Sequence, residues 1–312
     1  MKIFRSLHEL HELGQSLHLA LGVFDGVHIG HQAVIQCALN AAKREGGVAG
    51  LLTFDPHPIE VMAPAKAPRA LLATLEHKAS FVESLGVDLL VSIQFDLELA
   101  VMKAEDFIAE LLQAPVRTIA VGEDWRFGHL RKGDVELLER LSEQHLYRLE
   151  AVPPVIHDGE RISSSRIRQA IHDGNLTEAK IMLGRAYSMR GKVTKGRQLG
   201  RDLGFPTANL SVGRRQCPPQ GVWAVVVDIN GDGDWHPGVA NLGTRPTLQQ
   251  EELILEVHLL DFVGDLYGKE IEVRFESHLR CEFSFDSLDE LKLQIGDDVA
   301  QARKMLGDGL TR

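Results

Sequence analysis

Hydrophobic residues in the first half of the chain follow two alternating patterns. Short apolar runs of the length expected for buried strands occur at residues 18–24, 48–54, 88–93 and 117–122. Apolar side chains at helical spacing lie between and after these runs, at residues 32–45, 74–86, 103–113, 162–174 and 175–184. Strands that alternate with helices favour βαβ units and a parallel sheet.

The pattern changes near residue 185. From there on, strand-like segments are separated by Gly, Pro and Asp turns, at residues 187–196, 221–229, 236–243, 253–262, 270–275 and 278–285. A helical pattern at 287–306 closes the chain. Several strands with turn signals favour a compact β-barrel. The chain is therefore predicted to form an α/β domain over 1–185 and a β domain with a terminal helix over 186–312.

Composition narrows the possible partners and the compartment. The net charge of -10 argues against a nucleic-acid binder, whose footprint is a basic face. No apolar run approaches the roughly 18 residues of a membrane span, and the first residues lack the pattern of a signal peptide. Cys37, Cys217 and Cys281 cannot all pair within the chain. These features predict a reduced, cytoplasmic protein without a membrane partner, and a monomer is the default expectation.

The first candidate site follows the first predicted strand, where His28 and His31 stand among Gly22, Gly26 and Gly30. A helix N-terminus at this junction offers free N–H groups, and glycines let a phosphate approach the backbone. Two imidazoles can then donate hydrogen bonds to phosphate oxygens. Two other interpretations stay open: a capping turn with incidental histidines, or two ligands of a metal whose third ligand is not evident.

The second candidate site combines two segments of the β domain. Pro206 favours an extended backbone, so Thr207 and Asn209 point the same way and offer oxygens to Mg²⁺. Glu256 lies on an alternating strand, on the face opposite Leu255 and Val257. It is a candidate general base for an alcohol nucleophile. The alternatives are a turn with capping side chains for the first pair and a rim residue paired with a cation for Glu256.

Longer strings in the chain resemble a known family. G-V-F-D-G-V-H-I-G-H contains the H-x-G-H pattern of the nucleotidyltransferase superfamily, and TFDPHP, VGEDWRFG and ISSSRIR follow it. Together they resemble the adenylyltransferase half of the bacterial bifunctional riboflavin kinase/FAD synthetases, with Ser165 in place of the usual Thr. The glycine-rich segment that ends in F-P-T-A-N, followed by NLGTRPT and LEVHLLDF, is similar to the riboflavin kinase signature of the same family.

The resemblance implies a fold and two reactions. It implies a Rossmann-like nucleotidyltransferase domain with a parallel sheet, followed by a Greek-key β-barrel with a C-terminal helix. The C-terminal domain would use ATP to convert riboflavin to FMN, and the N-terminal domain would use ATP to convert FMN to FAD with release of pyrophosphate. The rivals are a kinase with a non-catalytic N-terminal nucleotide binder, and a flavin-binding protein without turnover.

The resemblance also assigns roles to residues. It implies ATP contacts in the adenylyltransferase for Gly22, Phe24, Asp25, Gly26, His28, His31, Ser164, Ser165 and Arg168, of which His28, His31 and Arg168 are catalytic. It implies ATP contacts in the kinase for Gly191, Gly196, Thr207 and Asn209, with Mg²⁺ on Thr207 and Asn209 and Glu256 as the catalytic base. Flavin contacts are expected at Phe54, Asp55, His57, Asp124, Phe127 and Arg280.

The two reactions explain why only one half needs a base. The nucleophile in FAD formation is a phosphate oxygen with a second pKa of ~6, so it is largely ionised at neutral pH. That half must hold two polyanions together and stabilise the transferring phosphate. The 5′-hydroxyl of riboflavin is neutral, so the kinase half benefits from a carboxylate.

Overall fold

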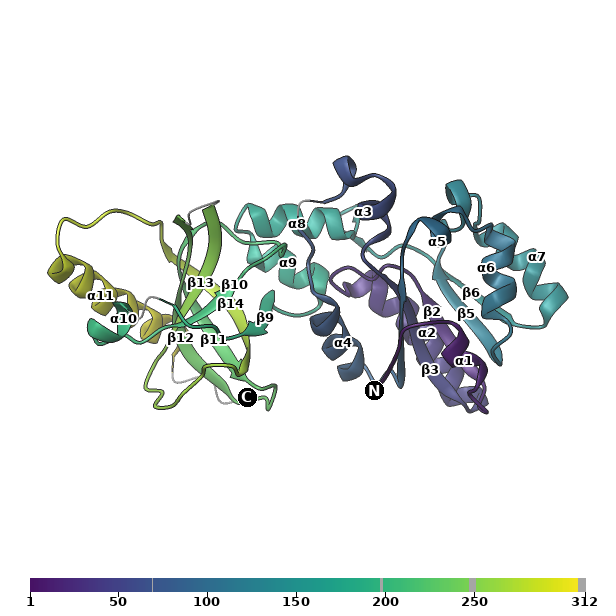
Figure 1. The fold of residues 1–312 in the computed structure, drawn as a ribbon, viewed down its shortest axis with the longest axis horizontal. Coiled ribbons are helices and arrows are strands. Elements are labelled where there is room, and N and C mark those ends of the chain that lie inside the picture. Colours follow the sequence, from purple (N-terminus) through teal and green to yellow (C-terminus); the bar gives the residue numbers. More distant parts are fainter. Residues whose placement is uncertain (69, 197–198, 247–250, 308–312) are drawn as a thin grey trace. The chain divides into compact units, whose positions relative to one another are not determined.

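The structure is a computed structural model of the chain that describes residues 1–68, 70–196, 199–246 and 251–307. It divides into two compact units, Met1–Ser164 and Ser165–Arg312 (Figure 1). Each unit has its own six-stranded sheet, and each is described by itself below.

The first unit is built on a parallel sheet with strand order β1-β4-β3-β2-β5-β6. The strands are β1 (Lys2–Phe4), β2 (Leu17–Leu21), β3 (Val48–Asp55), β4 (Leu89–Gln94), β5 (Val116–Gly122) and β6 (Arg148–Val152). From β2 the chain proceeds outward through β3 to β4, and later from β5 to β6 on the other side of β2. The order therefore reverses between β2 and β5, and ligands of open α/β sheets bind at the carboxyl ends of the strands at such a point.

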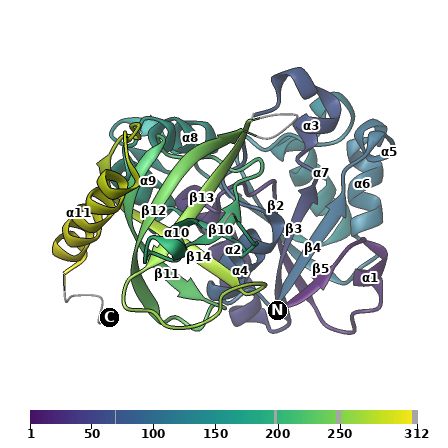
Figure 2. The ribbon, with the colours of Figure 1, turned by 60° about the vertical axis from the view of Figure 1, so that its left-hand side comes forward.

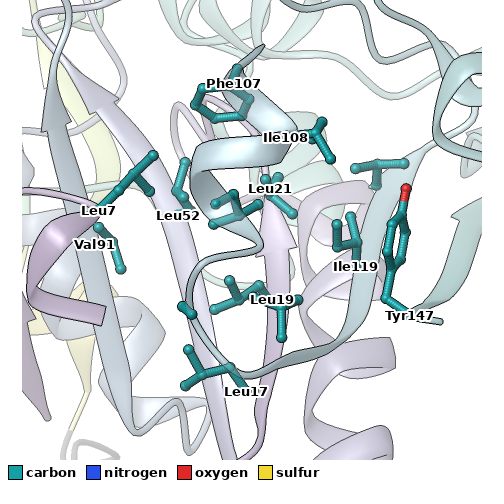
Figure 3. Close-up of a cluster of buried hydrophobic side chains, with 14 of the residues drawn as sticks. Leu7, Leu17, Leu19, Leu21, Leu52, Val91, Phe107, Ile108, Ile119 and Tyr147 are labelled. Atoms are coloured by element: carbon teal, nitrogen blue, oxygen red, sulfur yellow. The ribbon is translucent and has the colours of Figure 1, made fainter. Parts of the chain in front are cut away.

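Helices cover both faces of this sheet. The helices of the unit are α1 (His8–His11), α2 (Ile29–Glu45), α3 (Pro58–Met62), α4 (Leu75–Ser84), α5 (Leu97–Val101), α6 (Ala104–Leu111) and α7 (Val135–His145). Leu19 and Leu21 of β2 are buried on the face that packs against α6 and α7, and Figure 3 shows Leu21 next to Phe107 and Ile108 of α6. Ala20, between the two leucines, faces the opposite cluster with α2 and α4. This burial on both faces explains why β2 is apolar except at His18, which is also buried and hydrogen-bonds to Thr118 Oγ1 at 2.9 Å.

The second unit is an antiparallel, nearly closed barrel with strand order β10-β13-β12-β11-β14-β9. The strands are β9 (Ser188–Lys192), β10 (Ala208–Ser211), β11 (Gly221–Ile229), β12 (Trp235–Pro246), β13 (Glu251–Leu259) and β14 (Glu270–Arg280). Strands β11, β12 and β13 follow one another, and β14 returns to lie beside β11, which is a Greek key. A bridge between Thr194 and Asn209 links the segment after β9 to β10 and nearly closes the barrel.

Four helices accompany the barrel strands: α8 (Ser164–His172), α9 (Leu176–Leu183), α10 (Leu199–Asp202) and α11 (Leu288–Leu306). Figure 2 shows α11 lying along the outside of β11 and β12. The side chain of Asp298, 3% exposed, forms an ion pair with Arg280 at the end of β14 and ties α11 to the barrel.

The expected fold class is confirmed, with two errors of detail. Residues 18–24 were expected to be strand throughout, but β2 ends at Leu21, and Phe24 lies in the following turn with a φ of 54°. The segment 278–285 was expected to be strand, but β14 ends at Arg280 and residues 281–285 are irregular and mostly exposed. The strand ends there because its partner begins there: Arg280 pairs with Val222, and β11 starts at Gly221. The expected domain boundary near 185 remains a prediction.

Candidate functional site

A turn with unusual backbone geometry connects β2 to α2. Phe24 and Val27 have φ of 54° and 43°, in the left-handed region that L-residues seldom adopt. Gly26, at φ 78°, has no room for a side chain, because a Cβ there would lie 2.6 Å from Leu72 Cδ1. The glycine that sequence reasoning associated with phosphate therefore also has a packing reason.

Asp25 anchors this turn from inside the protein. It is 5% exposed, and its Oδ1 accepts a 2.9 Å hydrogen bond from the Leu72 backbone N–H. Its own carbonyl accepts a 2.9 Å hydrogen bond from the Ser164 hydroxyl. The first motif and Ser164 of the second motif, both expected at the ATP site, are thus in direct contact.

The two histidines of the first motif lie together where α2 begins. His28 is the N-cap of α2, and its Nδ1 accepts a hydrogen bond of 3.3 Å from the His31 backbone N–H. An accepting Nδ1 places the proton of the neutral ring on Nε2. The two rings stack with centroids 3.5 Å apart. Within the described part of the chain, neither ring belongs to a cluster of three metal-ligating side chains, so the metal interpretation gains no support.

A cavity of about 250 Å³ opens beside this turn, at the carboxyl end of β3. Phe54, Asp55 and His57, the expected flavin contacts, all line it, and so does Asp25. His57 is the N-cap of α3, where its Nδ1 accepts a hydrogen bond of 3.2 Å from the Ile59 backbone N–H. The structure therefore brings these three residues to one pocket next to the histidine motif.

Lys78 of α4 forms part of the cavity wall and was not recognised in the sequence. Its Nζ donates hydrogen bonds of 2.7 Å to the Val23 carbonyl and 3.1 Å to Thr53 Oγ1. Complete burial lowers the pKa of Lys78 to about 8, although the charges of Asp25 and Asp55 act to raise it. An ammonium group in this position is expensive to desolvate.

The second expected flavin segment, at the carboxyl end of β5, is arranged differently. Asp124 forms an ion pair with Arg161, and the hydrogen bond from Arg161 lowers the pKa of that carboxyl. Phe127 is 7% exposed and belongs to the hydrophobic core. The Trp125 ring stacks on it at 4.4 Å and is only partly buried, so the indole is the more accessible aromatic surface of this segment.

Ser165 and Arg168, from the second nucleotide motif, lie one turn apart on α8. Arg168 Nη2 donates a hydrogen bond of 3.2 Å to Ser165 Oγ. The guanidinium is held beside a hydroxyl, a combination of donors suited to phosphate oxygens.

The kinase residues line up across neighbouring strands of the barrel. Asn209 of β10 pairs with Glu256 of β13, and Glu256 pairs with Asn241 of β12. Directly opposite residues of antiparallel strands project on the same face with Cβ atoms ~5 Å apart. Leu255 and Val257 are fully buried on the other face, as the alternation predicted. The three polar side chains therefore form one row on the face opposite these two apolar residues.

Two acceptor atoms in this row have unusual surroundings. The Oδ1 atoms of Asn209 and Asn241 are buried and, among the described residues, have no hydrogen-bond partner. Asn241 Nδ2 donates a 2.8 Å hydrogen bond to Glu282 Oε1, which orients its amide. Buried polar atoms are normally satisfied, so two orphaned oxygens beside a carboxylate indicate a site for a cation or a hydroxyl.

Of the other expected kinase residues, Gly196 contacts the polar row, while Gly191 and Arg280 contact other side chains. Gly196 lies against Asn209, because a Cβ on it would be 2.5 Å from Asn209 Oδ1. Gly191 lies on β9 instead, beside the Arg215 guanidinium. Thr207 directly precedes β10, and the extended segment before it is held by a 2.9 Å hydrogen bond between His258 Nδ1 and the Pro206 carbonyl. Arg280 is engaged by Asp298 and Phe283.

Three contributors escaped the sequence analysis: Lys78, Asn241 and Glu282. A lysine in a helix is usually exposed to solvent, so nothing in the sequence around Lys78 marked it as a buried residue. Asn241 stands in the quoted NLGTRPT string, and an alternating reading of residues 236–243 could have placed it on the polar face.

Comparison with known proteins identifies a family for the segment that forms each site. Residues 11–166 match the sequence model of the FAD synthetase family, and residues 183–306 match that of riboflavin kinase. Three relatives named bifunctional riboflavin kinase/FMN adenylyltransferase are similar over nearly the whole chain. The relative from Escherichia coli K12 is 40% identical, and the alignment covers 98% of both chains. The relative from Pseudomonas fluorescens is 38% identical over 98% of both chains. The relative from Haemophilus influenzae is 37% identical over 97% of this chain and 98% of its own.

A solved structure is also similar over nearly the whole chain. It is titled as a macrolide-efflux protein from Streptococcus pneumoniae, is 31% identical, and matches with a TM-score of 0.83 over 97% of this chain and 98% of its own. Within the described residues, no helix has the length and apolar character needed to cross a membrane.

Proposed function

Because this chain belongs to the family of bifunctional riboflavin kinases/FMN adenylyltransferases, it phosphorylates riboflavin to FMN and adenylylates FMN to FAD, and we propose which of its residues perform each step. The kinase reaction belongs to the barrel domain and the adenylyltransferase reaction to the parallel-sheet domain. We place the functional boundary near residue 185, close to residue 183, where the region that matches riboflavin kinase begins.

In the kinase, Glu256 is the general base. It accepts the proton of the riboflavin 5′-hydroxyl, whose oxygen attacks the γ-phosphorus of ATP while ADP leaves. Asn209 and Thr207 would hold Mg²⁺, which neutralises phosphate charge when bound. The buried, unpartnered Oδ1 of Asn209 supports this assignment, because it is a hard acceptor placed beside the base. Gly196, which has no side chain, lets the backbone at that position lie against Asn209. Gly191 is proposed as a further contact to the nucleotide.

In the adenylyltransferase, no base is needed, because the FMN phosphate oxygen attacks the α-phosphorus of ATP as an anion and pyrophosphate leaves. His28 and His31 donate hydrogen bonds to the phosphates, and Arg168 contributes a guanidinium. Ser164 and Ser165 supply hydroxyl donors. The turn from Gly22 to Gly26, including Phe24 and Asp25, contacts the nucleotide. The contact between Asp25 and Ser164 supports their joint role.

The flavin ring of FMN occupies the cavity beside β3. Phe54, Asp55 and His57 line this cavity, which offers an aromatic ring together with polar side chains that can orient a ligand. Asp124 and Phe127 from the next segment complete the proposed flavin contacts of this domain, and Arg280 is a separate proposed flavin contact in the kinase domain. Trp125 offers the exposed aromatic face next to Phe127.

The observation that carries the proposal is the in-register row of Asn209, Glu256 and Asn241. The test is to incubate the protein with riboflavin, ATP and Mg²⁺ and to separate the flavins by chromatography. Glu256→Gln should stop FMN formation while added FMN is still converted to FAD, and His28→Ala should do the reverse. Normal FMN formation by Glu256→Gln would remove Glu256 as the base, and equal loss of both activities in either variant would contradict separate sites.

We also propose that the protein acts in the cytoplasm as a monomer without a nucleic-acid partner. The thiols of Cys37, Cys217 and Cys281 are all free, which suits a reducing compartment. Size-exclusion chromatography with light scattering tests the monomer.

A further inference from the structure

A buried lysine connects the cavity of the first unit to the histidine motif. Lys78 is 6% exposed, and its Nζ is within 2.7 Å of the Val23 carbonyl and 3.1 Å of Thr53 Oγ1. Thr53 in turn donates a 2.8 Å hydrogen bond to the same carbonyl. The ammonium therefore ties α4 to the end of β3 and to the residue where the β2–α2 turn begins.

Packing alone does not explain a lysine at this position. An ammonium group loses most of its hydration here, while a methionine would fill similar space without that penalty. Burial has already lowered the pKa of Lys78 to about 8 against the opposing effect of Asp25 and Asp55. A group kept at the expense of stability, in the wall of a cavity, is a candidate for a functional role.

The turn that Lys78 holds is one that the backbone disfavours. Phe24 and Val27 both have left-handed φ, and the turn leads directly to His28. Such a conformation persists only where surrounding contacts over-determine it. Lys78 supplies one such contact at Val23, and Asp25 supplies another through the Leu72 N–H.

The side chains that line the cavity carry mostly negative charge, so the positive charge of Lys78 affects how the cavity can bind an anionic substrate. Three carboxyl groups, those of Asp25, Asp55 and Glu76, line the cavity together with the imidazole of His57. Among the described lining residues, Lys78 is the one basic side chain besides His57. Without the ammonium, the carboxylates would face a substrate that carries a phosphate, and like charges at close range repel.

We propose that Lys78 is a positioning residue for FAD formation, whose ammonium holds the turn from Phe24 to Val27 so that His28 and His31 face the reacting phosphates, and offsets the charges of Asp25 and Asp55. The proposal rests on the role given above to His28 and His31. Lys78 acts by holding the turn and by making the electrostatic potential in the cavity less negative. Both effects require the protonated, positively charged form of its side chain.

The test compares the rates of FAD formation from added FMN and ATP in the wild type, Lys78→Met and Lys78→Arg between pH 6.5 and 9.5. Lys43→Met, on the exposed face of α2, is the matched control. FMN formation from riboflavin by the same samples reports that the kinase domain is intact, and the melting temperature of each variant reports the folding of the unit that contains Lys78.

At pH 7, Lys78→Met should lower kcat for FAD formation about 100-fold, the effect of misplacing reacting groups by roughly 1 Å, with a smaller change in the KM for ATP. The wild-type rate should fall as the pH rises past about 8, where the ammonium is lost. That decline should be absent from the residual activity of Lys78→Met and should move to higher pH in Lys78→Arg, because a guanidinium stays protonated.

A purely structural role would predict a different result. If Lys78→Met lost activity only through unfolding, its melting temperature would fall and the wild-type rate would show no decline near pH 8. Full activity of Lys78→Met, or a wild-type profile that is flat to pH 9.5, overturns the proposal even if Lys78→Arg does not fold. Unchanged FAD formation in His28→Ala would instead refute the role of the histidine motif, so the two failures are distinguishable.

Discussion

A single methyl group at Gly196 should disable the kinase without disturbing the other reaction. The position lies directly against the amide of Asn209, where a Cβ would be 2.5 Å from Oδ1, 2.6 Å from Nδ2 and 2.7 Å from Cγ. Because Asn209 is 5% exposed and sits between paired strands, its side chain has little room to yield. Gly196→Ala therefore tests whether the orientation of this amide matters for phosphoryl transfer.

The size of the effect follows from the overlap. Non-bonded heavy atoms prefer separations of about 3.5 Å, so the amide must shift by about 1 Å. A shift of about 1 Å in a group that aligns reactants lowers the rate about 100-fold, which corresponds to about 2.7 kcal/mol of transition-state stabilisation. Because the amide has little room to yield, the overpacking should also cost the barrel about 1–3 kcal/mol of stability, which leaves FAD formation by the other domain unchanged.

The assay measures kcat/KM for FMN formation and, separately, FAD formation from added FMN. Gly296→Ala in α11 is the control, because a Cβ there meets nothing within 4 Å and alanine favours a helix. The reasoning is refuted if Gly196→Ala phosphorylates riboflavin at the wild-type rate, or if the control loses activity to the same extent.

Three further predictions follow from the same contacts. Asp298→Ala should lower the free energy of unfolding of the barrel by about 3–5 kcal/mol, because it leaves the largely buried Arg280 without its carboxylate. Denaturant unfolding measures the change, and an unchanged denaturation midpoint would show that the ion pair contributes nothing to stability. Chelation of Mg²⁺ should abolish FMN formation, and Asn209→Ala should raise the Mg²⁺ concentration needed for half-maximal rate; an unchanged requirement would exclude Asn209 as a ligand. The pKa of Lys78 is about 8 in the folded protein and 10.5 ordinarily, so the unfolded chain binds the proton more tightly. The free energy of unfolding should therefore rise by about 3 kcal/mol as the pH increases from 8 to 10.5. Lys78→Met should remove this rise, and an identical slope in both proteins would contradict the prediction.

Much of the fold could be predicted because hydrophobic periodicity is local. The apolar runs that became β2 and β5 are buried on both faces, and a parallel sheet between helix layers requires that pattern. The alternation around Glu256 placed its side chain on the face opposite Leu255 and Val257, which the burial of these two residues confirms. The error at 278–285 arose because the strand ends at Arg280 where its partner β11 begins at Gly221, and no local pattern reveals where a distant partner strand begins.

The parts of the site that were missed depend on contacts between distant segments. Lys78 approaches Val23 across 55 positions of sequence, and nothing in the pattern of α4 distinguishes it from a solvated lysine. Asn241 meets Glu282 across 41 positions, and only the register of β12 with β13 brings Asn241 beside Glu256. Residue types suggested chemistry, but strand register decided which of them act together.

The alternation along β13 also limits how this gene can change. Successive side chains of a strand point to opposite faces, so the loss or gain of one codon within β13 would turn Glu256 inward and bring Val257 or Leu255 to its place. A change of two codons would preserve the facing but move the carboxylate out of the row with Asn209 and Asn241. Descendants of this sequence can therefore vary in length at loops such as 231–234, between β11 and β12, while β13 tolerates substitution but not insertion or deletion.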